Sequence, residues 1–362
     1  MITEREAMSR AVALALRGWG RVAPNPLVGA VVVREGRVLG EGWHAEFGGA
    51  HAEAAALSRC ADPRGAALVV TLEPCNHHGK TPPCTEALMA QGIARVVIAG
   101  RDPHPVAQGG AEQLRAAGIA VEIGLGAEEA AAANAAYLWS TVRRDRPFVA
   151  VKVAASLDGF IADVEGHSQW ISGPAAHEFV HWLRAGFDAI AVGRETAVRD
   201  DPQLTVRGAV TPRVPPARVV FAGRGPLPAT LRCLDPAGGG PAIVVTQPAV
   251  AAVRRAALGP AGVQLLEAAT PAAGLQALRE AGVCALLVEG GGTLVGNLLE
   301  ADLVDRVYRI TAPVWLGAGA PAFGSRAGVP LGDAARWVVT ERRPLGSDTL
   351  LVVDRALCLQ GS

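Results

Sequence analysis

The sequence predicts two consecutive α/β domains. Its 362 residues exceed what one typical core holds, and apolar strand-like runs alternate with helical patterns in both halves. Near the middle, the polar run Arg144-Asp145-Arg146-Pro147 interrupts this alternation. We therefore expect one domain over residues 1–145 and another over residues 146–362.

The first domain is expected to be a mixed or parallel sheet with helices on both faces. Thr3 and Glu6 fit a capping box that begins a helix ending near Gly18. Glu35-Gly36 suits the turn of a hairpin. The expected strands are 28–33, 37–43, 67–72, 95–99 and 121–126, and further helices begin near 51, 84 and 110 and cover 127–143.

The second domain is expected to be another α/β sheet that ends in a hairpin. Its predicted strands, with helical patterns between most of them, are 148–154, 189–192, 218–221, 242–245, 284–289 and 306–311. Residues 337–341 and 349–354 flank Leu345-Gly346-Ser347-Asp348 and predict the closing hairpin. The proline- and glycine-rich residues 208–241 predict a long, mobile excursion.

Composition predicts a globular, soluble protein and leaves small anionic substrates open, because these need only a local pocket. Thirty-four basic residues balance 34 acidic ones and only 4% of residues are aromatic, which disfavours binding to a nucleic-acid backbone. No apolar run reaches the ~20 residues that span a bilayer, and residues 1–6 contain no apolar signal core. Six cysteines in so long a chain do not indicate a disulfide framework, and thiolates suit a reducing compartment. We expect a cytoplasmic protein without nucleic-acid or membrane partners.

Residues 51–84 contain the strongest chemical signal. His51, Cys75 and Cys84 supply an imidazole and two thiolates, which fill three corners of a zinc tetrahedron and leave the fourth for a water that the metal acidifies. Glu53 then moves protons and is not a ligand. The pattern is that of zinc-dependent base deaminases, H-x-E followed by P-C-x-x-C, except that eight residues separate the two cysteines.

Helix geometry limits how this site can form. Residues two apart on a helix point in nearly opposite directions, so His51 and Glu53 share a site only where a helix begins and the metal lies off its end. A structural zinc site is the alternative, with His44, His77 or His78 as the fourth ligand. Such a site has no need of Glu53, so a catalytic site is favoured.

The first domain resembles the deaminase half of the bifunctional riboflavin-biosynthesis deaminase/reductases. The matching segments are Pro24–Gly29, His51–Glu53 and Pro74–Cys84, including the long loop between the cysteines. The resemblance implies a cytidine-deaminase-like α/β/α sandwich and hydrolytic deamination of a diaminopyrimidinone that carries a phosphoribosylamino group. It places three residues at substrate contacts: Asn25, His44 and Lys80.

The second domain has weaker signals, which gather late in the chain. An apolar strand ending in Glu289 runs into Gly290-Gly291-Gly292-Thr293 and a helical pattern, and bare glycines at such a turn let backbone N–H groups approach a phosphate. Glu289 is expected to face a cavity or a partner. Arg184 and Arg207 have planar forks that suit a phosphate. A tight turn without a ligand and solvated arginines are the alternatives.

These segments resemble the reductase half of the same family, which has a dihydrofolate-reductase-like fold and uses NADPH. The resemblance implies reduction of the open-chain aldehyde form of the ribosyl group to a ribityl chain, and a possible homo-oligomer through this domain. Ala222-Gly223-Arg224 depart from the family's usual residues. The implied cofactor positions are Ala154, Trp170, Thr196, Asp200, Gly291, Gly292, Thr293, Leu294, Val295, Gly296 and Asn297. The implied substrate positions are Lys152, Ser168, Arg184, Leu204, Arg207 and Glu289.

Two other functions remain as alternatives to a zinc-dependent deaminase joined to an NADPH-dependent reductase. One is a zinc deaminase of nucleosides or tRNA bases, which the neutral charge and scarce aromatic residues disfavour. The other is a protein without enzymatic activity, with a structural zinc and a ligand-binding or assembly module. The carboxylate of Glu53 beside the metal ligands disfavours this last alternative.

Overall fold

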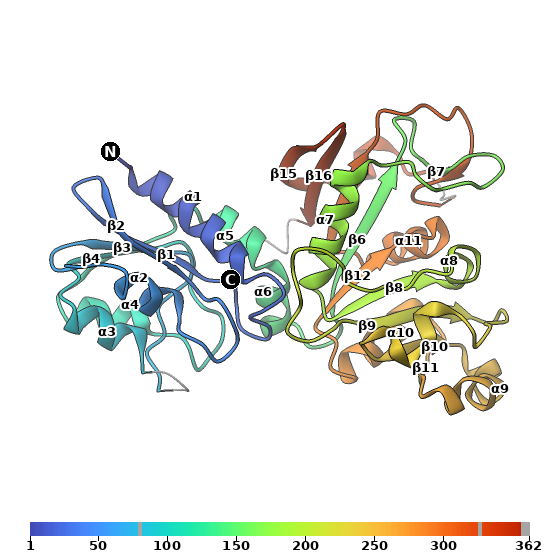
Figure 1. The fold of residues 1–362 in the computed structure, drawn as a ribbon, viewed down its shortest axis with the longest axis horizontal. Coiled ribbons are helices and arrows are strands. Elements are labelled where there is room, and N and C mark those ends of the chain that lie inside the picture. The colour runs from blue at the N-terminus through green and yellow to red at the C-terminus, as the bar shows by residue number, and fades with distance from the viewer. Residues whose placement is uncertain (79–81, 325–327, 356–362) are drawn as a thin grey trace. The chain divides into compact units, whose positions relative to one another are not determined.

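A computed structural model describes residues 1–78, 82–324 and 328–355. The described residues form two compact units, one over residues 1–142 and the other over residues 143–355 (Figure 1). From the sequence we expected this boundary at Arg146. In the described residues, no helix is both long and apolar enough to cross a membrane.

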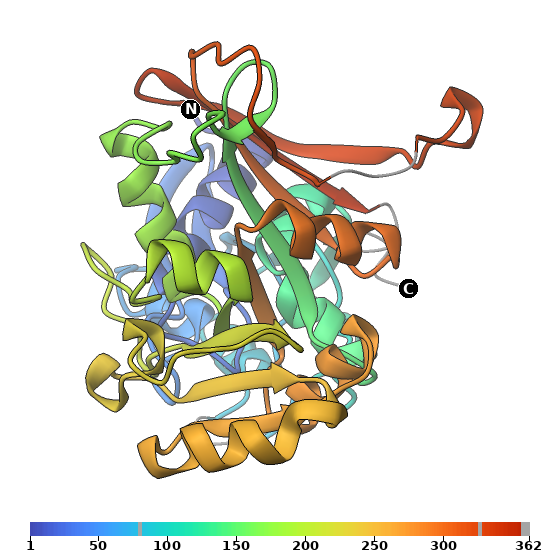
Figure 2. The ribbon, with the colours of Figure 1, turned by 90° about the vertical axis from the view of Figure 1, so that its right-hand side faces the viewer.

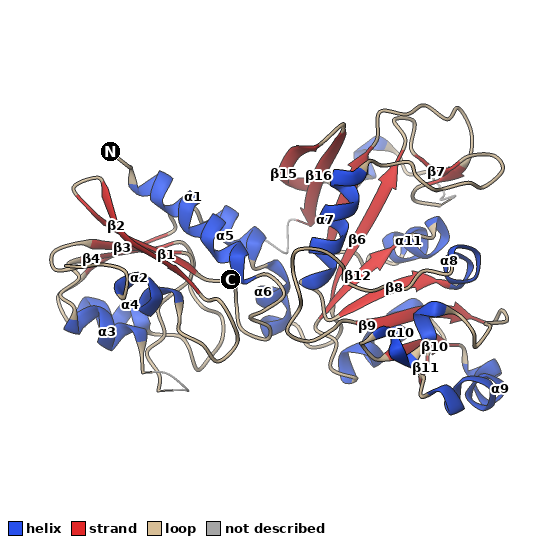
Figure 3. Ribbon diagram, in the orientation of Figure 1, coloured by secondary structure: helices blue, strands red, loops and turns tan. Residues whose placement is uncertain are grey.

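The first unit is built on a five-stranded mixed sheet. Its strands are β1 (Gly29–Arg34), β2 (Arg37–Trp43), β3 (Ala67–Val70), β4 (Arg95–Ile98) and β5 (Ala120–Ile123), in the order β2-β1-β3-β4-β5 (Figure 3). β1 is antiparallel to β2 and β3, whereas β3, β4 and β5 run parallel. The hairpin predicted at Glu35-Gly36 joins β1 to β2.

Helices cover both faces of this sheet because its strands are apolar on both sides. Val31, Val69 and Val97 pack against the first and fifth helices, and Leu68 and Val96 pack against the helices on the opposite face. This alternation is the period of two that a strand imposes. The helices are α1 (Glu4–Ala15), α2 (Ala52–Leu57), α3 (Cys84–Ala90), α4 (Gly110–Ala116), α5 (Ala127–Ala133) and α6 (Ala135–Val142), with the short turn η1 (Leu16–Gly18) after α1.

The single helix predicted over residues 127–143 is wrong, because Asn134 divides it into α5 and α6. The Asn134 side chain is buried and bonds the backbone of Leu27. Its Oδ1 accepts from the Leu27 N–H at 2.8 Å, and its Nδ2 donates to the Leu27 carbonyl at 2.8 Å. This contact with a distant segment interrupts the helix.

The second unit is built on a nine-stranded sheet of order β11-β10-β9-β8-β12-β6-β13-β16-β15. Its first seven strands run parallel, and β16 and β15 form the predicted antiparallel hairpin at one edge. Figure 2 shows this hairpin in red at the top and the yellow strands of the other edge below. The strands are β6 (Phe148–Ala155), β8 (Ala189–Gly193), β9 (Ala217–Gly223), β10 (Ala242–Thr246), β11 (Gln264–Glu267), β12 (Ala285–Glu289), β13 (Arg306–Thr311), β15 (Trp337–Leu345) and β16 (Asp348–Arg355), and β7 (Phe160–Ala162) pairs with β14 (Ala320–Pro321) in a separate ribbon.

Helices also cover both faces of the second sheet. Leu275 of α10 and Leu298 of α11 pack on one face, and Ala197 of α8 and Leu258 of α9 pack on the other. This arrangement confirms the predicted α/β class of the unit. The helices are α7 (Pro174–Ala185), α8 (Arg194–Asp200), α9 (Pro248–Leu258), α10 (Pro271–Glu280) and α11 (Gly292–Glu300), with short turns η2 (Arg232–Leu234), η3 (Pro236–Gly238), η4 (Gly259–Ala261) and η5 (Leu331–Asp333).

The excursion predicted over residues 208–241 is wrong for the part that follows β9. Leu231 and Leu234 are buried in the core. The buried Arg218 guanidinium donates to the carbonyls of Asp235 and Gly240, each at 2.6 Å. Side-chain burial and these hydrogen bonds hold the segment on the sheet.

Candidate functional site

Three potential metal ligands meet in the first unit. His51 Nδ1 lies 3.5 Å from Cys75 Sγ and 3.3 Å from Cys84 Sγ, and the three ligand atoms lie within 4.8 Å of one another. In a tetrahedral zinc site, the usual bond lengths place a nitrogen and a sulfur ligand about 3.6 Å apart. The spacing and the donor set therefore fit zinc. Among the described residues, this is the one group of His, Cys, Asp and Glu side chains close enough to hold a metal.

Two helix beginnings bring these ligands together. His51 precedes α2 in an extended conformation, and Cys84 is the first residue of α3. His51 and Glu53 therefore meet at a helix start, as the sequence required. Gly42 of β2 lets α2 approach closely, because a Cβ at this position would lie 2.4 Å from the Ala52 carbonyl oxygen.

Glu53 is a buried carboxylate beside the ligand group. Its residue is only 3% exposed, and its carboxyl hydrogen-bonds the side chain of Cys84. Burial raises the pKa of Glu53 to about 7. A carboxyl group with this pKa can accept and return a proton near neutral pH.

The two cysteine sulfurs are not equivalent. Hydrogen bonds from Cys84 and then from His51 lower the pKa of the Cys75 thiol to about 4. The hydrogen bond to Cys75 and burial raise the pKa of the Cys84 thiol. Two thiolates this close together would repel each other, and a divalent cation would remove that repulsion.

His44 lies next to the ligand group but is not aimed at it. Its ring is 5.6 Å from the His51 ring between centroids. Its Nδ1 faces the Ala50 carbonyl oxygen at 3.0 Å and therefore donates, so its Nε2 accepts from Asn25 Nδ2 at 3.1 Å. Burial lowers the pKa of His44. A neutral ring with both nitrogens bonded does not complete a metal's coordination.

The loop between the two cysteines contains the other histidines considered from the sequence. His78 Nε2 pairs with Glu86 Oε1 at 3.2 Å, and His77 is not in the ligand group. Lys80, a predicted substrate contact, lies outside the described residues.

Glu73 is a buried residue near this site that was not predicted from the sequence. It follows β3 and its side chain is fully buried. Its carboxylate accepts from the Ala111 N–H at 2.9 Å and from the Asp102 N–H at 3.4 Å. Glu73 therefore ties the segment that leads to Cys75 to the start of α4. The sequence feature that could have indicated Glu73 is an acidic residue that follows an apolar strand, the same feature that drew attention to Glu289.

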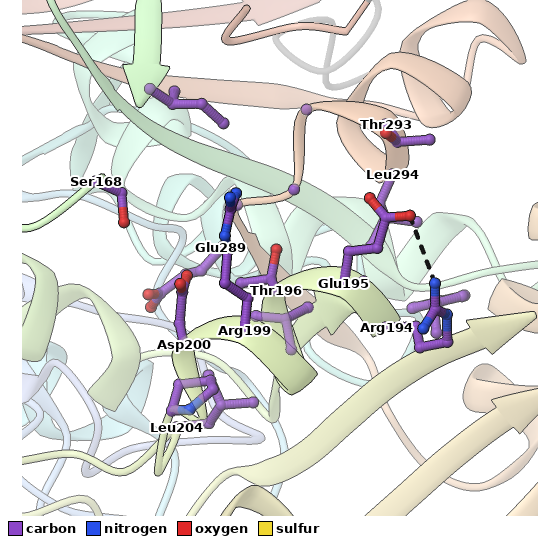
Figure 4. A pocket seen from close by; sticks show the side chains of 18 of the residues that line it. Ser168, Arg194, Glu195, Thr196, Arg199, Asp200, Leu204, Glu289, Thr293 and Leu294 are labelled. Atoms are coloured by element: carbon purple, nitrogen blue, oxygen red, sulfur yellow. Dashed lines mark hydrogen bonds and ion pairs between the residues drawn. The ribbon is translucent and has the colours of Figure 1, made fainter. Parts of the chain in front are cut away.

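A cavity of about 1220 Å³ lies in the second unit at the carboxyl ends of its parallel strands (Figure 4). This is where open α/β sheets commonly bind ligands. Val295 and Gly296 do not line it and are buried within α11. The predicted residues that line it are Lys152, Ala154, Ser168, Trp170, Arg184, Thr196, Asp200, Leu204, Arg207, Glu289, Gly291, Gly292, Thr293, Leu294 and Asn297.

The glycine turn between β12 and α11 has room only for glycine. Gly291 has a φ of 80°, and a Cβ on it would lie 2.9 Å from Thr196 Oγ1. A Cβ on Gly292 would lie 2.5 Å from the Pro321 carbonyl oxygen. No side chain at Gly291 or Gly292 therefore separates the backbone at the start of α11 from the cavity. This suits a phosphate bound at a helix N-terminus.

Lys152, Glu289 and Arg184 form a group of charged residues in the cavity. Lys152 of β6 and Glu289 of β12 are register partners on adjacent parallel strands. Arg184 donates to Glu289 through Nε at 2.6 Å and Nη2 at 2.8 Å, and to the Thr205 carbonyl through Nη1 at 2.8 Å. The guanidinium of Arg184 is thus already bonded within the protein, and is not free to bind a phosphate as the sequence suggested. Burial lowers the pKa of Lys152, and the charge of Glu289 opposes this shift.

His177 and His181 also line the cavity and were missed from the sequence. They lie one turn apart on α7. The His181 Nδ1 accepts from the Arg207 N–H at 3.2 Å, and burial together with Arg184 and Arg207 lowers the pKa of His181 to about 4. The ring of His177 lies 4.4 Å from the exposed Trp170 ring between centroids. Their spacing from Arg184 on one helix face was the available signal.

Two family models match the chain. The family described as RibD C-terminal domain matches residues 147–351, and that described as cytidine and deoxycytidylate deaminase zinc-binding region matches residues 1–100. The chain is 38% identical to the riboflavin biosynthesis protein RibD of Aquifex aeolicus over 87% of this chain and 88% of the relative. It is 37% identical to RibD of Escherichia coli over 95% of this chain and 97% of the relative.

Solved structures of similar proteins agree with these matches. A diaminohydroxyphosphoribosylaminopyrimidine deaminase/5-amino-6-(5-phosphoribosylamino)uracil reductase from Thermotoga maritima superposes with a TM-score of 0.82 at 36% identity, covering 98% of this chain and 99% of that one. Acinetobacter baumannii RibD superposes with a TM-score of 0.79 at 35% identity, covering 97% and 98%.

Proposed function

This chain belongs to the RibD family of riboflavin-biosynthesis proteins and is a bifunctional deaminase and reductase, and we propose that its two units divide the reactions between them. The first domain, residues 1–145, deaminates 2,5-diamino-6-(5-phosphoribosylamino)pyrimidin-4-one. The second, residues 146–362, reduces the resulting 5-amino-6-(5-phosphoribosylamino)uracil. The name of the Thermotoga maritima relative supports these substrates.

In the first domain, His51, Cys75 and Cys84 would hold a zinc ion. The geometry of the three donor atoms supports this assignment. Zinc supplies Lewis acidity that makes a water nucleophilic near neutral pH. Glu53 removes a proton from the attacking water and delivers it to the departing amine, and its burial beside the ligands supports this role.

Asn25 and His44 would orient the pyrimidine, together with Lys80. The neutral His44 ring is fixed by the Ala50 carbonyl and presents the Asn25 amide beside the ligand group. A fixed polar pair of this kind orients a ring without a charge that would compete with the metal.

In the second domain, the cavity would hold NADPH and the phosphoribosyl substrate together. NADPH supplies a hydride for the open-chain aldehyde carbon of the ribose. The bare backbone at Gly291 and Gly292 would hold the cofactor's pyrophosphate, and Ala154, Trp170, Thr196, Asp200 and the start of α11 would hold the rest. The substrate would lie toward Lys152, Ser168, Arg184, Leu204, Arg207 and Glu289. The Arg207 guanidinium donates to the neutral Gln203 Oε1 at 3.1 Å, whereas Arg184 is bonded to the Glu289 carboxylate, so Arg207 is the better candidate for the substrate's phosphate.

The observation that carries this proposal is the meeting of three ligands and a buried carboxylate at two helix beginnings. The direct test adds the diaminopyrimidinone substrate and NADPH to the purified full chain. Ammonia release and NADPH oxidation are followed separately, and zinc is counted per chain. Ammonia release should precede NADPH oxidation, and adding the uracil intermediate should bypass the first step. Ammonia release without bound metal would refute the zinc assignment.

The cellular setting is also part of the proposal. We place the protein in the cytoplasm because its paired thiols suit a reducing compartment.

A homo-oligomer through the second domain remains a prediction from the family.

A further inference from the structure

Three arginines converge at one end of the cavity in the second unit. Arg194 begins α8 directly after β8, Arg224 directly follows β9, and Arg254 extends from α9. Arg194 and Arg224 line the cavity. Arg194 lies against Gly225, where a Cβ would fall 2.4 Å from the Arg194 Nε. The absence of a side chain on Gly225 therefore lets these guanidinium groups gather.

The positive charge of this cluster is poorly compensated. Arg254 donates to the Gly223 carbonyl at 3.0 Å and to the Gly225 carbonyl, both neutral acceptors. Arg224 donates to the amide oxygen of Gln247. Burial lowers the pKa of Arg254, and the charge of Arg194 lowers it further.

In the part of the chain that the structure describes, Glu195 is the one carboxylate that forms an ion pair with this cluster, and it is a weak partner. Among the described residues, Arg194 pairs with Glu195 at 3.5 Å, and the Glu195 side chain is 78% exposed. The dashed line in Figure 4 marks this contact. Water and salt screen such a pair, which typically contributes ~0–1 kcal/mol. This end of the cavity therefore favours an anion.

The position of the cluster relates it to the proposed cofactor site. Thr196, on the same helix as Arg194, is next to the Gly291 turn. Figure 4 shows Ser168 and Glu289 on one side of Thr196 and Arg194 on the other. A dinucleotide with its pyrophosphate at the turn and its nicotinamide toward Glu289 must extend its adenosine toward Arg194. Phe221, Thr246 and Gln247 line the same end of the cavity with uncharged side chains.

We propose that Arg194 and Arg224 bind the 2′-phosphate of NADPH and that this contact selects NADPH over NADH. The inference rests on the proposed reductase function. NADPH and NADH differ here by a phosphate dianion in place of a hydroxyl, and guanidinium groups bind phosphate through paired, charge-assisted hydrogen bonds. Arg254 is bonded to carbonyls and holds the loop of Arg224 in place. This assigns a function to the segment Ala222-Gly223-Arg224, where the sequence departs from the family pattern.

The test compares nucleotides that differ only in the 2′-phosphate. Binding of 2′,5′-ADP and of 5′-ADP to the full chain is measured by calorimetry for wild type and for Arg194→Gln, Arg224→Gln and the double variant. The double variant should lose about 10- to 100-fold in affinity for 2′,5′-ADP, the range expected for hydrogen bonds to a charged group. Its affinity for 5′-ADP should not change. The NADPH-over-NADH ratio of kcat/KM should fall by a similar factor.

Arg255→Gln is the matched control. Arg255 also lies on α9, but it pairs with Glu267 at 2.6 Å and does not line the cavity. It removes one positive charge from the same region, so it should leave the affinity for 2′,5′-ADP unchanged.

The outcomes separate this inference from the proposed function. A wild-type chain that binds neither 2′,5′-ADP nor NADPH would refute the reductase assignment itself. Wild-type binding with unchanged discrimination in the double variant would overturn only the 2′-phosphate site. Equal loss of both nucleotides in each single variant would also overturn it, since the arginines would then not recognise the phosphate.

Discussion

Arg184 and Glu289 face each other as an ion pair with two hydrogen bonds, Nε to Oε1 at 2.6 Å and Nη2 to Oε2 at 2.8 Å. Both side chains are nearly buried, at 11% and 8% exposure. The pair joins α7 to the end of β12, directly before the glycine turn. The third nitrogen of Arg184 bonds the Thr205 carbonyl, in the segment that leads to Arg207. One contact therefore positions both the proposed cofactor turn and the proposed substrate arginine.

Breaking this pair should destabilise the second unit. Glu289→Gln leaves the Arg184 charge buried without a counter-charge, which typically costs ~3–5 kcal/mol. Glu267→Gln is the control, because it breaks the exposed pair with Arg255 and should cost at most ~1 kcal/mol. Urea unfolding of the full chain measures both values. Similar small changes in the two variants would show that the pair does not hold the cavity together.

The glycine turn should tolerate no side chain when cofactor binds. Gly291→Ala and Gly282→Ala both place alanine at a positive φ, 80° and 94°, so the backbone strain alone should cost each ~1–2 kcal/mol of stability. A Cβ at Gly291 would meet Thr196, whereas Gly282 has nothing within 4 Å. NADPH affinity, measured by fluorescence titration, should therefore fall only in Gly291→Ala. Equal affinities would place the cofactor elsewhere.

His181 should make the stability of the second unit sensitive to acid. Its folded pKa of about 4 lies below the ~6.5 of an unfolded histidine. Between these two pH values, His181 is protonated in the unfolded chain but stays neutral in the folded chain. The free energy of unfolding therefore falls as the pH drops from 6.5 toward 4. His181→Asn keeps an acceptor for the Arg207 N–H but does not titrate. Between pH 7 and 4.5, the thermal unfolding midpoint should fall less in the variant than in wild type. An identical dependence of the midpoint on pH in both proteins would contradict the lowered pKa of His181.

Removing the metal should abolish the deamination and leave the reduction unchanged. All three proposed ligands lie in the first unit, so chelation of zinc should abolish ammonia release. NADPH oxidation with the uracil intermediate should continue at its original rate. Added zinc should restore the first activity in wild type but not in Cys75→Ser. Loss of both reactions on chelation would show that the metal also supports the second unit.

Local signals explain most of what the sequence predicted. The capping box at Thr3 and Glu6 forms as expected, and α2 begins directly after His51, as a shared site with Glu53 required. These features depend on residues close together in the chain. The strand-helix alternation predicted the α/β class of both domains for the same reason.

Long-range contacts explain what it did not predict. Asn134 interrupts a helical pattern because it bonds Leu27, 107 residues away. Arg184 has the fork that suits a phosphate, but only the folded chain brings Glu289 to it. Leu231 and Leu234 are apolar residues within a segment rich in proline and glycine, and their burial depends on strands before and after them.

The role of Glu53 beside the three zinc ligands is tested by measuring both activities of Glu53→Gln together with its zinc content. The variant should keep one zinc per chain, lose about 10²- to 10⁴-fold in the rate of ammonia release, as expected for a general acid–base residue, and reduce the uracil intermediate at the wild-type rate. Wild-type ammonia release from the zinc-loaded variant would contradict this role.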